Sequence, residues 1–444
     1  MKPAARFLVP VFCAAWIAAE SAAASGLRDD CDITIAQDGS AAYRTVQEGL
    51  KSAFEGAALC IEPGTYDLAG FSGTFHVRLS LIGRNAGATV LKNGGPLKFS
   101  KGFTVKNLTF SDYRDPVFVL VPGTRQTQDG ILIEGNVFSR SGSIVKDGSQ
   151  AGAEIRNVSI VGNRFSDLSS DKGLRAIGLS GEAALERITV RNNSFHNLRS
   201  TNDRKYAMAI MVGANDTRDK NRNIDISCNT FDGIVGGTRT SNGNDHPETH
   251  AVLAYGDNIS VASNIVRNIN QSRDHEAIYL KANHSRIVNN IVDNGGADGG
   301  GGDITIKGGA YENNLVSGNR VTGGHEGIGI FVTGEALVED NYIDKPGGRR
   351  GIVIFGRGKA VNIRNNLVYT KGKSIAVHDV GGGQITNNVL SNLIDVNNST
   401  LERQGNSTGD SGDPSCGKSG ACPDMSFGRS DGGICKVLDG RNMP

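Results

Sequence analysis

The chain has almost no net charge and few aromatic residues. Its 444 residues carry a formal net charge of +1, and Phe, Trp and Tyr together make up 6% of them. A balance near zero argues against a general nucleic-acid-binding protein, because such proteins carry an excess of basic residues that neutralises phosphates. The only tryptophan is Trp16, in an N-terminal segment that we expect to be removed. Any platform that stacks on a sugar ring must therefore use Tyr or Phe.

Beyond residue 24 the sequence has no apolar run long enough to cross a bilayer. Residues 1–24 are typical of a secretory signal peptide, because Lys2 and Arg6 precede the apolar run FLVPVFCAAWIAA and a small-residue cleavage site follows. We therefore expect a secreted or periplasmic protein. We also expect a monomer that binds neither a membrane nor a nucleic acid.

The cysteines do not have a zinc-binding spacing, since no two of them are separated by two residues. Of the seven, Cys13 leaves with the signal peptide, and an even number in an exported chain suggests disulfide bonds. Cys31 and Cys60 are the pair that we expect first, because both lie in the N-terminal segment. Cys228 lies in an apolar turn, where we expect a packed thiol. The remaining cysteines lie in a Gly/Ser-rich tail and are Cys416, Cys422 and Cys435.

Glycine is abundant, with 60 residues, and asparagine recurs at a nearly regular spacing. Ten asparagines each follow a short β-type run and lie 22 to 36 residues apart. They are Asn136, Asn163, Asn193, Asn229, Asn264, Asn290, Asn319, Asn341, Asn366 and Asn388. A pattern with this period is typical of a solenoid, and its short strands predict an all-β parallel β-helix of about ten coils. Asparagine suits the turn because it tolerates the left-handed conformation, and its amide can bond to the same amide one coil away.

The segment before these repeats predicts a cap over the open end of the helix. Thr45 and Glu48 have the spacing of a capping box at the start of TVQEGLKSAF. This helix lies in DGSAAYRTVQEGL, which with CIEPGTY and LIGRNAGATVL resembles the pectin-lyase-like superfamily of right-handed parallel β-helices. The expected organisation is a signal peptide, a cap with the first coil, a single-stranded right-handed β-helix and a Cys/Gly-rich cap or tail. These parts span residues 1–24, 25–105, 106–395 and 396–444.

A second strand follows each asparagine turn, and the alignment of these strands predicts a functional face. The alignment is anchored on the inward residues Val252, Ile278, Ile304, Ile328 and Ile352. Alternation then places outward Tyr255, Lys281, Lys307, Phe331 and Phe355. Tyr279 lies two positions before Lys281, and the edge of the face holds His250, His275, His325, Glu276 and Glu326. Because equivalent positions in adjacent coils lie about 4.8 Å apart, we expect Lys281 and Lys307 to be neighbours.

Two stacked lysines between aromatic rings suit an acidic polysaccharide. A lysine can neutralise a uronate carboxylate, which makes the adjacent C5 proton easier to remove, and β-elimination then needs a base and a proton donor. We expect Lys307 to be the base, Lys281 a neutraliser or second base, and Tyr279 the acid. His250 and His325 complete the candidate catalytic residues. The candidate substrate-binding residues are Tyr255, Phe331, Phe355, Arg349 and Arg350.

The same stretch resembles the alginate lyase and chondroitinase B family of polysaccharide lyases. The resemblance rests on HEAIYLKANHS and DITIKGGAYENNLVSGNRV. It implies that Lys307 is the lysine base, while the family's arginine on the next coil is replaced by Phe331. That family also neutralises its substrate with Ca²⁺, which is a candidate cofactor here. The candidate ligands are Glu276, Asp298 and Asp303, because Ca²⁺ prefers oxygen ligands.

Three other functions stay open from the sequence. A uronate C5-epimerase would begin with the same proton removal. An inverting glycoside hydrolase needs two carboxylates, for which Glu276 and Glu326 are candidates two coils apart. A non-catalytic polysaccharide-binding protein would use the same fold without chemistry. The sequence favours a polysaccharide lyase and leaves its polymer open.

Overall fold

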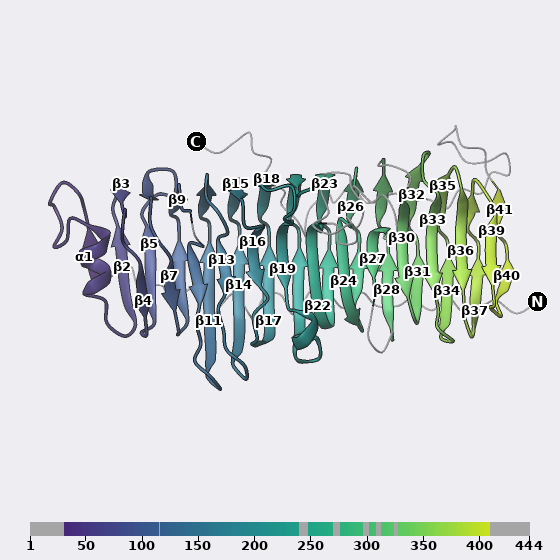
Figure 1. Cartoon of the computed structure of the whole chain (residues 1–444), viewed down its shortest axis with the longest axis horizontal. Helices are drawn as coiled ribbons and strands as arrows, with labels where there is room; N and C mark the ends of the chain where they lie inside the picture. The colour runs from purple at the N-terminus through teal and green to yellow at the C-terminus, as the bar shows by residue number, and fades with distance from the viewer. Residues whose placement is uncertain are drawn as a thin grey trace, which may run out of the picture.

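A computed structural model describes residues 31–114, 116–238, 247–269, 276–295, 302–307, 312–323 and 327–408. Within these ranges the chain winds into an elongated stack of coils, with the single α-helix at one end (Figure 1). The stack is a parallel β-solenoid of about 13 turns. The predicted right-handed parallel β-helix is confirmed, with more turns than the ten that the asparagines indicated. The expected signal peptide and the cysteine-rich tail lie outside the described residues.

One side of the coils is a 14-stranded parallel sheet, here called ladder 3. Its strands are β3 (Gly64–Asp67), β6 (Thr89–Lys92), β9 (Thr109–Ser111), β12 (Val137–Ser139), β15 (Arg164–Ser170), β18 (Ser194–Ser200), β21 (Thr230–Val235), β23 (Ile265–Ile269), β26 (Ile291–Asp293), β29 (Arg320–Thr322), β32 (Tyr342–Lys345), β35 (Leu367–Thr370), β38 (Val389–Leu390) and β41 (Ser407–Thr408).

The other two sides belong to a 27-stranded sheet that consists of two ladders joined through the long strand β22 (Thr249–Ala262). Ladder 1 contains the first half of β22 with β4 (Gly73–Phe75), β7 (Leu97–Phe99), β10 (Phe118–Leu120), β13 (Val145–Asp147), β16 (Leu174–Leu179), β19 (Ala207–Val212), β24 (Ile278–Asn283), β27 (Gly302–Ile306), β30 (Ile328–Thr333), β33 (Arg350–Phe355), β36 (Lys373–His378) and β39 (Ile394–Asn397).

Ladder 2 contains the second half of β22 and the remaining strands. They are β1 (Ile33–Ile35), β2 (Ala57–Ile61), β5 (Leu79–Gly83), β8 (Phe103–Lys106), β11 (Thr127–Glu134), β14 (Glu154–Val161), β17 (Ala184–Arg191), β20 (Arg222–Ser227), β25 (Arg286–Val288), β28 (Asn314–Ser317), β31 (Ala336–Glu339), β34 (Ala360–Arg364), β37 (Gly382–Thr386) and β40 (Glu402–Gln404). The pairing of β1 with β2 and of β2 with β5 shows that regular stacking begins well before residue 106.

The interior of the stack is filled by equivalent side chains that lie on one another. In ladder 3 five phenylalanines are stacked along the axis with ring centres 4.5 to 5.3 Å apart. They are Phe110, Phe138, Phe165, Phe195 and Phe231. Aliphatic residues continue the row from Val266 onward, and all are buried. Because each coil can bury its apolar face only against its neighbours, stability is distributed along the stack.

The predicted asparagine ladder is present and holds the turn between ladders 2 and 3. The side-chain oxygen of Asn163, for example, accepts from the backbone N–H and the side-chain amide of Asn136, at 2.9 and 3.1 Å. The ladder extends one step beyond the ten predicted residues, to Asn406. The expected left-handed conformation, however, belongs to the preceding residue, such as Asn192 or Asn289. The ladder asparagines are selected for their inward hydrogen bonds, and the residue before each one makes the sharp turn.

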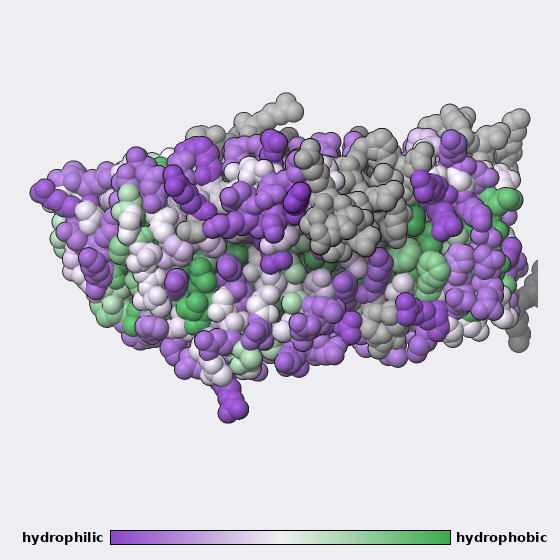
Figure 2. Space-filling model, in the orientation of Figure 1, coloured by the Kyte–Doolittle hydropathy of each residue, from purple (hydrophilic) through white to green (hydrophobic). Residues whose placement is uncertain are grey.

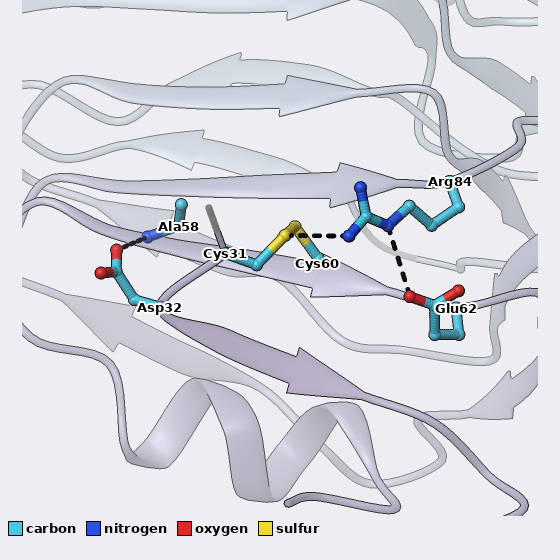
Figure 3. The surroundings of a disulfide bond; sticks show 6 residues. All are labelled: Cys31, Asp32, Ala58, Cys60, Glu62 and Arg84. Atoms are coloured by element: carbon cyan, nitrogen blue, oxygen red, sulfur yellow. Dashed lines mark hydrogen bonds and ion pairs between the residues drawn. A yellow bond between two sulfur atoms is a disulfide. The ribbon is translucent and has the colours of Figure 1, made fainter. Parts of the chain in front are cut away.

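The N-terminal end is closed by α1 (Val46–Lys51) and fixed by a disulfide bond. Thr45 and Glu48 form the predicted capping box. Cys31 and Cys60 are bonded as predicted, and Arg84 reaches Sγ of Cys31 at 3.3 Å and Glu62 at 3.3 Å (Figure 3). The bond closes a separation of 29 residues, which corresponds to about 3–4 kcal/mol of stabilisation in the chain-entropy model.

Cys228 is disulfide-bonded, so the expectation of a packed thiol was wrong. Its turn gave no sign of this, because an apolar strand end suits a thiol and a disulfide equally well.

None of the helices in the described ranges is long and apolar enough to cross a membrane. The visible surface is mostly hydrophilic, with apolar residues gathered along the middle of the long face (Figure 2).

Candidate functional site

A corner at the start of the longer strands of ladder 1, such as β19 and β22, decides which side chains reach the outer face. Met208 pairs with His250 and Ile210 with Val252, and the alanine between each pair turns the corner. Ala251 and Val252 are consecutive in the chain, yet both are in the core. The alternation of side chains is therefore interrupted at the corner. As a result, the residue before each corner alanine, such as Met208 or His250, also points outward.

The corner leaves three outward rows along ladder 1. The first row is Arg175, Met208, His250, Glu276, Gly302, Ile328, Arg350 and Lys373. The second row is Lys146, Gly178, Met211, Leu253, Tyr279, Thr305, Phe331, Val353 and Ala376. The third row is Tyr255, Lys281, Lys307, Thr333, Phe355 and His378. The structure thus brings most of the predicted residues onto one face.

The two predicted lysines are neighbours, and aromatic rings alternate with them. Lys281 Nζ lies 5.1 Å from the ring centre of Tyr255 and 5.5 Å from that of Tyr279. Lys307 Nζ lies 5.2 Å from the ring centre of Tyr279 and 5.1 Å from that of Phe331. Each ammonium group is therefore within the range of a cation–π contact with two rings. Both lysine side chains are partly exposed, whereas the three rings are nearly buried.

The predicted alignment was wrong for one strand. Ile304 pairs with Ile330, which in turn pairs with Ile352, so the predicted anchor Ile328 is displaced by two residues. A shift of two residues preserves the alternation of faces, which is why the apolar pattern of β30 did not reveal it. Phe331 consequently lies beside Thr305, in the row of Tyr279, and Thr333 follows Lys307 in the third row.

A buried histidine lies between two carboxylates at the edge of the lysine pair. The ring of His250 is completely buried, and its Nδ1 is 2.9 Å from the backbone oxygen of Glu276. Its Nε2 lies 3.7 Å from a carboxylate oxygen of Glu248, an ion-pair distance too long for a hydrogen bond. Burial lowers the pKa of His250, but the contact with Glu248 and the charges of both glutamates outweigh burial and raise the pKa overall. The ring also packs edge-on against Tyr279, with 5.7 Å between ring centres.

The electrostatic field of this region reaches across several coils. The contact with His250 lowers the pKa of Glu248 against the effect of burial, and the charges of Lys281 and Arg175 lower it further. Burial, followed by the charge of Glu248, raises the pKa of Tyr255 to about 12. Glu248 therefore interacts with Lys281 and with Arg175, which is three coils away from Lys281.

The three predicted Ca²⁺ ligands do not converge in the described residues. Glu276 is on the outer face, nearly buried and 3.6 Å from the ring of His250. Asp303 stands at the corner position, points inward and forms a fully buried ion pair with Lys345 at 2.5 Å. Asp298 lies outside the described ranges, within which no group of three potential metal ligands occurs. The Ca²⁺ prediction remains untested, and no step proposed below passes through a metal.

The remaining predicted residues extend the face toward the C-terminus. Phe355 stacks on His378 with 4.7 Å between ring centres and also contacts Phe331. Arg350 is partly exposed in the first row, and the adjacent Arg349 is exposed. The histidine and glutamate predicted at the edge of this part, His325 and Glu326, lie outside the described residues. None of the catalytic or binding roles is tested by these positions.

The sequence analysis missed a cleft of about 860 Å³ on the same face, toward the N-terminus. This cleft, called the basic cleft below, is lined by Arg114, Arg140, Lys146, Lys172, Arg175 and Tyr206, among others. Lys146 belongs to the second outward row and Arg175 to the first. Extending the strand alignment toward the N-terminus, through Ile210 and Ile177, would have identified both.

No family model matches the chain, and no curated protein matches it. Among solved structures, the A-module of a mannuronan C-5 epimerase from Azotobacter vinelandii is 14% identical, with a TM-score of 0.40, and the match covers 82% of this chain and 94% of the module. A PL6 family polysaccharide lyase from Pseudopedobacter saltans is 14% identical, with a TM-score of 0.32 and coverages of 89% and 95%.

The catalytic unit of a GH87 alpha-1,3-glucanase from Streptomyces thermodiastaticus is 12% identical, with a TM-score of 0.36. The match covers 81% of this chain and 64% of the glucanase unit, so the chain spans less than two thirds of that protein. At these identities and TM-scores the matches assign neither an activity nor a substrate to this chain.

Proposed function

We propose that the chain is an exported polysaccharide lyase that cleaves a uronate-containing polymer on the outer face of ladder 1. The observation that carries the proposal is the alternation of two ammonium groups with three aromatic rings along the coil axis. The nearly buried rings hold the two partly exposed amino groups beside each other, and adjacent cations suit a polymer with a carboxylate on every sugar ring. An isolated surface lysine would not be held between two rings in this way.

The proposed reaction uses three of these side chains. Lys281 neutralises the uronate carboxylate, which makes the C5 proton more acidic. Lys307 takes that proton as the base, the electron pair of the C5–H bond forms the C4–C5 double bond, and the bond from C4 to the glycosidic oxygen breaks. The hydroxyl of Tyr279 gives its proton to the departing oxygen. The products are one saturated end and one unsaturated uronate, with no water consumed.

His250 acts through Tyr279 in this scheme and does not touch the sugar. Its ring is fully buried and packs edge-on against Tyr279, and its two nitrogens face Glu276 and Glu248. A charged imidazole held by two carboxylates would fix the position of the tyrosine ring. We therefore assign His250 as a positioning residue, which narrows the catalytic role predicted from the sequence.

Product analysis tests the proposal against its rivals. Digests of polygalacturonate, polymannuronate and a glucuronate-containing glycosaminoglycan would be examined by mass spectrometry. A lyase gives fragments whose summed mass equals that of the polymer, with absorbance from the new double bond. Fragments that carry the added mass of water would support a hydrolase instead. An uncleaved polymer with altered sugar configuration would support an epimerase, and no change on any of the three would contradict the assignment to uronate chemistry.

A further inference from the structure

The basic cleft carries more positive charge than its neighbours neutralise. Arg114, Lys146, Lys172 and Arg175 line it, and none of them has an ion-pair partner among the described residues. The fifth cation, Arg140, is paired with Asp112 at 2.9 Å and is therefore already neutralised. A concave site lined by several cations that form no close ion pair concentrates anions from solution.

The two carboxylates that line the cleft do not neutralise these cations. Asp147 is nearly buried and accepts from the backbone N–H groups of Ser149 and Gly181, at 2.8 and 2.9 Å. Burial raises the pKa of Asp147 above its ordinary value despite these bonds. The other carboxylate, Asp171, is exposed to solvent. The cleft therefore has an excess of positive charge on its walls.

Arg175 is held in a fixed orientation and uses one of its five N–H donors within the described residues. Its guanidinium lies 4.4 Å from the ring centre of Tyr206, and Nη1 donates to Ser180 at 3.3 Å. The Nε group is buried and has no hydrogen-bond partner within the described residues. An arginine immobilised on an aromatic ring loses little entropy on binding, so its remaining donors suit a planar carboxylate.

The cleft and the lysine pair lie on the same rows of ladder 1. Lys146 lies in the same outward row as Tyr279, and Arg175 lies in the same row as His250. Three coil spacings separate Arg175 from the coil of Lys281, a distance of about 14 Å along the axis. The apolar side chains between them, Met208, Met211 and Leu253, are nearly buried and form one cluster with Tyr255 and Tyr279. One coil spacing is close to the length of one sugar residue in an extended chain, so neighbouring units could meet successive coils.

We propose that the basic cleft binds uronate units of the same polymer, several units away from the bond that is cleaved. The proposal rests on the proposed function for the identity of the polymer, but the binding that it describes can be measured without cleavage. It implies that the enzyme requires a long acidic substrate. Short oligomers would occupy the lysine pair alone and gain nothing from the cleft.

The test is calorimetric binding of uronate oligomers to the full chain carrying Lys307→Ala, which prevents turnover. The probes are galacturonate and mannuronate oligomers, as dimers and at about six units, enough to span the coil distance above. Arg175→Ala and Lys146→Ala are each added to this background. The matched control is Lys98→Ala, because Lys98 is exposed in the same outward row, two strands before Lys146, and does not line the cleft.

We expect both cleft variants to bind the long oligomers at least about tenfold more weakly, since each removes a charged contact, and to bind dimers as before. Lys98→Ala should leave both affinities unchanged, and methyl-esterified galacturonate oligomers should bind weakly to every variant. Lys146 is exposed, so its variant keeps the test valid if Arg175→Ala does not fold. Long oligomers that bind all variants equally, or esterified oligomers that bind as well as charged ones, would overturn the proposal.

The same variants separate this proposal from the proposed function. If Arg175-dependent binding is found but the wild-type chain cleaves no uronate polymer, the lyase assignment fails and the cleft stands. If the wild-type chain cleaves uronate polymers and Arg175→Ala in the wild-type background keeps the same kcat/KM on long substrates, the cleft proposal fails and the lyase assignment stands.

Discussion

Removal of one asparagine side chain from the middle of the asparagine ladder should destabilise the protein far more than removal of the side chain at its end. Asn290 is completely buried, and its side chain takes part in five hydrogen bonds. Its oxygen accepts from the backbone N–H and the side-chain amide of Asn264, and its amide donates to Val261, Val288 and Asn319. Asn290→Ala removes all five at once.

The magnitude follows from what the lost bonds leave behind. Val288 retains a donor in the backbone N–H of Ser263, and Asn319 retains the backbone N–H of residue 290. The buried backbone N–H of Asn264 loses its acceptor, a cost of about 1–3 kcal/mol, and the other bonds contribute about 0.5–1.5 kcal/mol each. These contributions sum to about 3–9 kcal/mol, and we expect a loss in the lower half of that range because Val288 and Asn319 keep a partner. Asn406→Ala is the matched control, because Asn406 is the last member of the ladder and water can reach its partly exposed side chain, so about 1 kcal/mol is expected.

Guanidinium unfolding followed by circular dichroism would measure the global effect in both variants. Because a solenoid can open locally, amide hydrogen exchange should also be measured around Asn264 and Asn388, the residues whose N–H groups lose an acceptor. Faster exchange confined to the coils next to Asn290 would support the reasoning. Equal destabilisation by the two substitutions, or no measurable loss for Asn290→Ala, would show that the ladder does not stabilise the stack in the way described.

Three further outcomes are expected. Lys307→Ala should lower kcat by at least about 10²-fold on any polymer that the parent cleaves, as steady-state kinetics would measure. The free energy of unfolding, measured with denaturant, should change by less than about 1 kcal/mol, because the side chain lies outside the core. Asp303→Ala should cost about 3–5 kcal/mol in denaturant unfolding, because it leaves the buried ammonium of Lys345 unpaired, and adding Lys345→Met should recover part of that loss. His250 has a raised pKa, so its contribution to stability should be complete below pH of about 6.5 and should disappear as pH rises through the raised value. His250→Gln should flatten that part of the pH–stability profile, and a profile unchanged from the parent would contradict the assignment. His284→Gln is measured alongside, because the pKa of His284 is raised as well.

The fold was predictable because its signal is repeated many times. The amide of each ladder asparagine must meet the same amide in the next coil, so selection leaves a visible mark at every turn. Asn406 escaped notice because Ser407 and Thr408 follow it, where an apolar residue stands two positions after each of the ten predicted asparagines. The assignment of the left-handed conformation to the asparagine itself was wrong because the requirement for a turn and the requirement for an inward amide fall on adjacent residues.

The candidate site was predictable where strand spacing is regular and not where a corner intervenes. The alignment of Lys281 with Lys307 depended only on the I-x-L pattern of two consecutive strands. The inward direction of Asp303 could not be read from that pattern, because the corner places two consecutive residues in the core. Its burial is possible only because Lys345, which follows a different asparagine turn 42 residues later, supplies the opposite charge. Such long-range pairing leaves no local trace in a sequence.

The basic cleft shows a different limit. Its residues come from loops and strands of several coils, and loop residues have no fixed spacing that an alignment can use. Lys146 and Arg175 are exceptions because they lie on strands of ladder 1, in rows that the alignment could have followed. Exposed loop residues such as Arg114 and Lys172 carry no such signal.

The central claim is that the outer face of ladder 1 removes a proton from a uronate. The most direct measurement is the ultraviolet absorbance of unsaturated uronate during incubation of the full chain with polygalacturonate, polymannuronate and a glucuronate-containing polymer. Lys307→Ala and Lys98→Ala are measured in parallel as the active-face and control variants. The account predicts that absorbance rises on at least one polymer with the parent and with Lys98→Ala, and that Lys307→Ala is slower by about 10²-fold or more. A rise that Lys307→Ala matches, or no rise on any polymer, would contradict it.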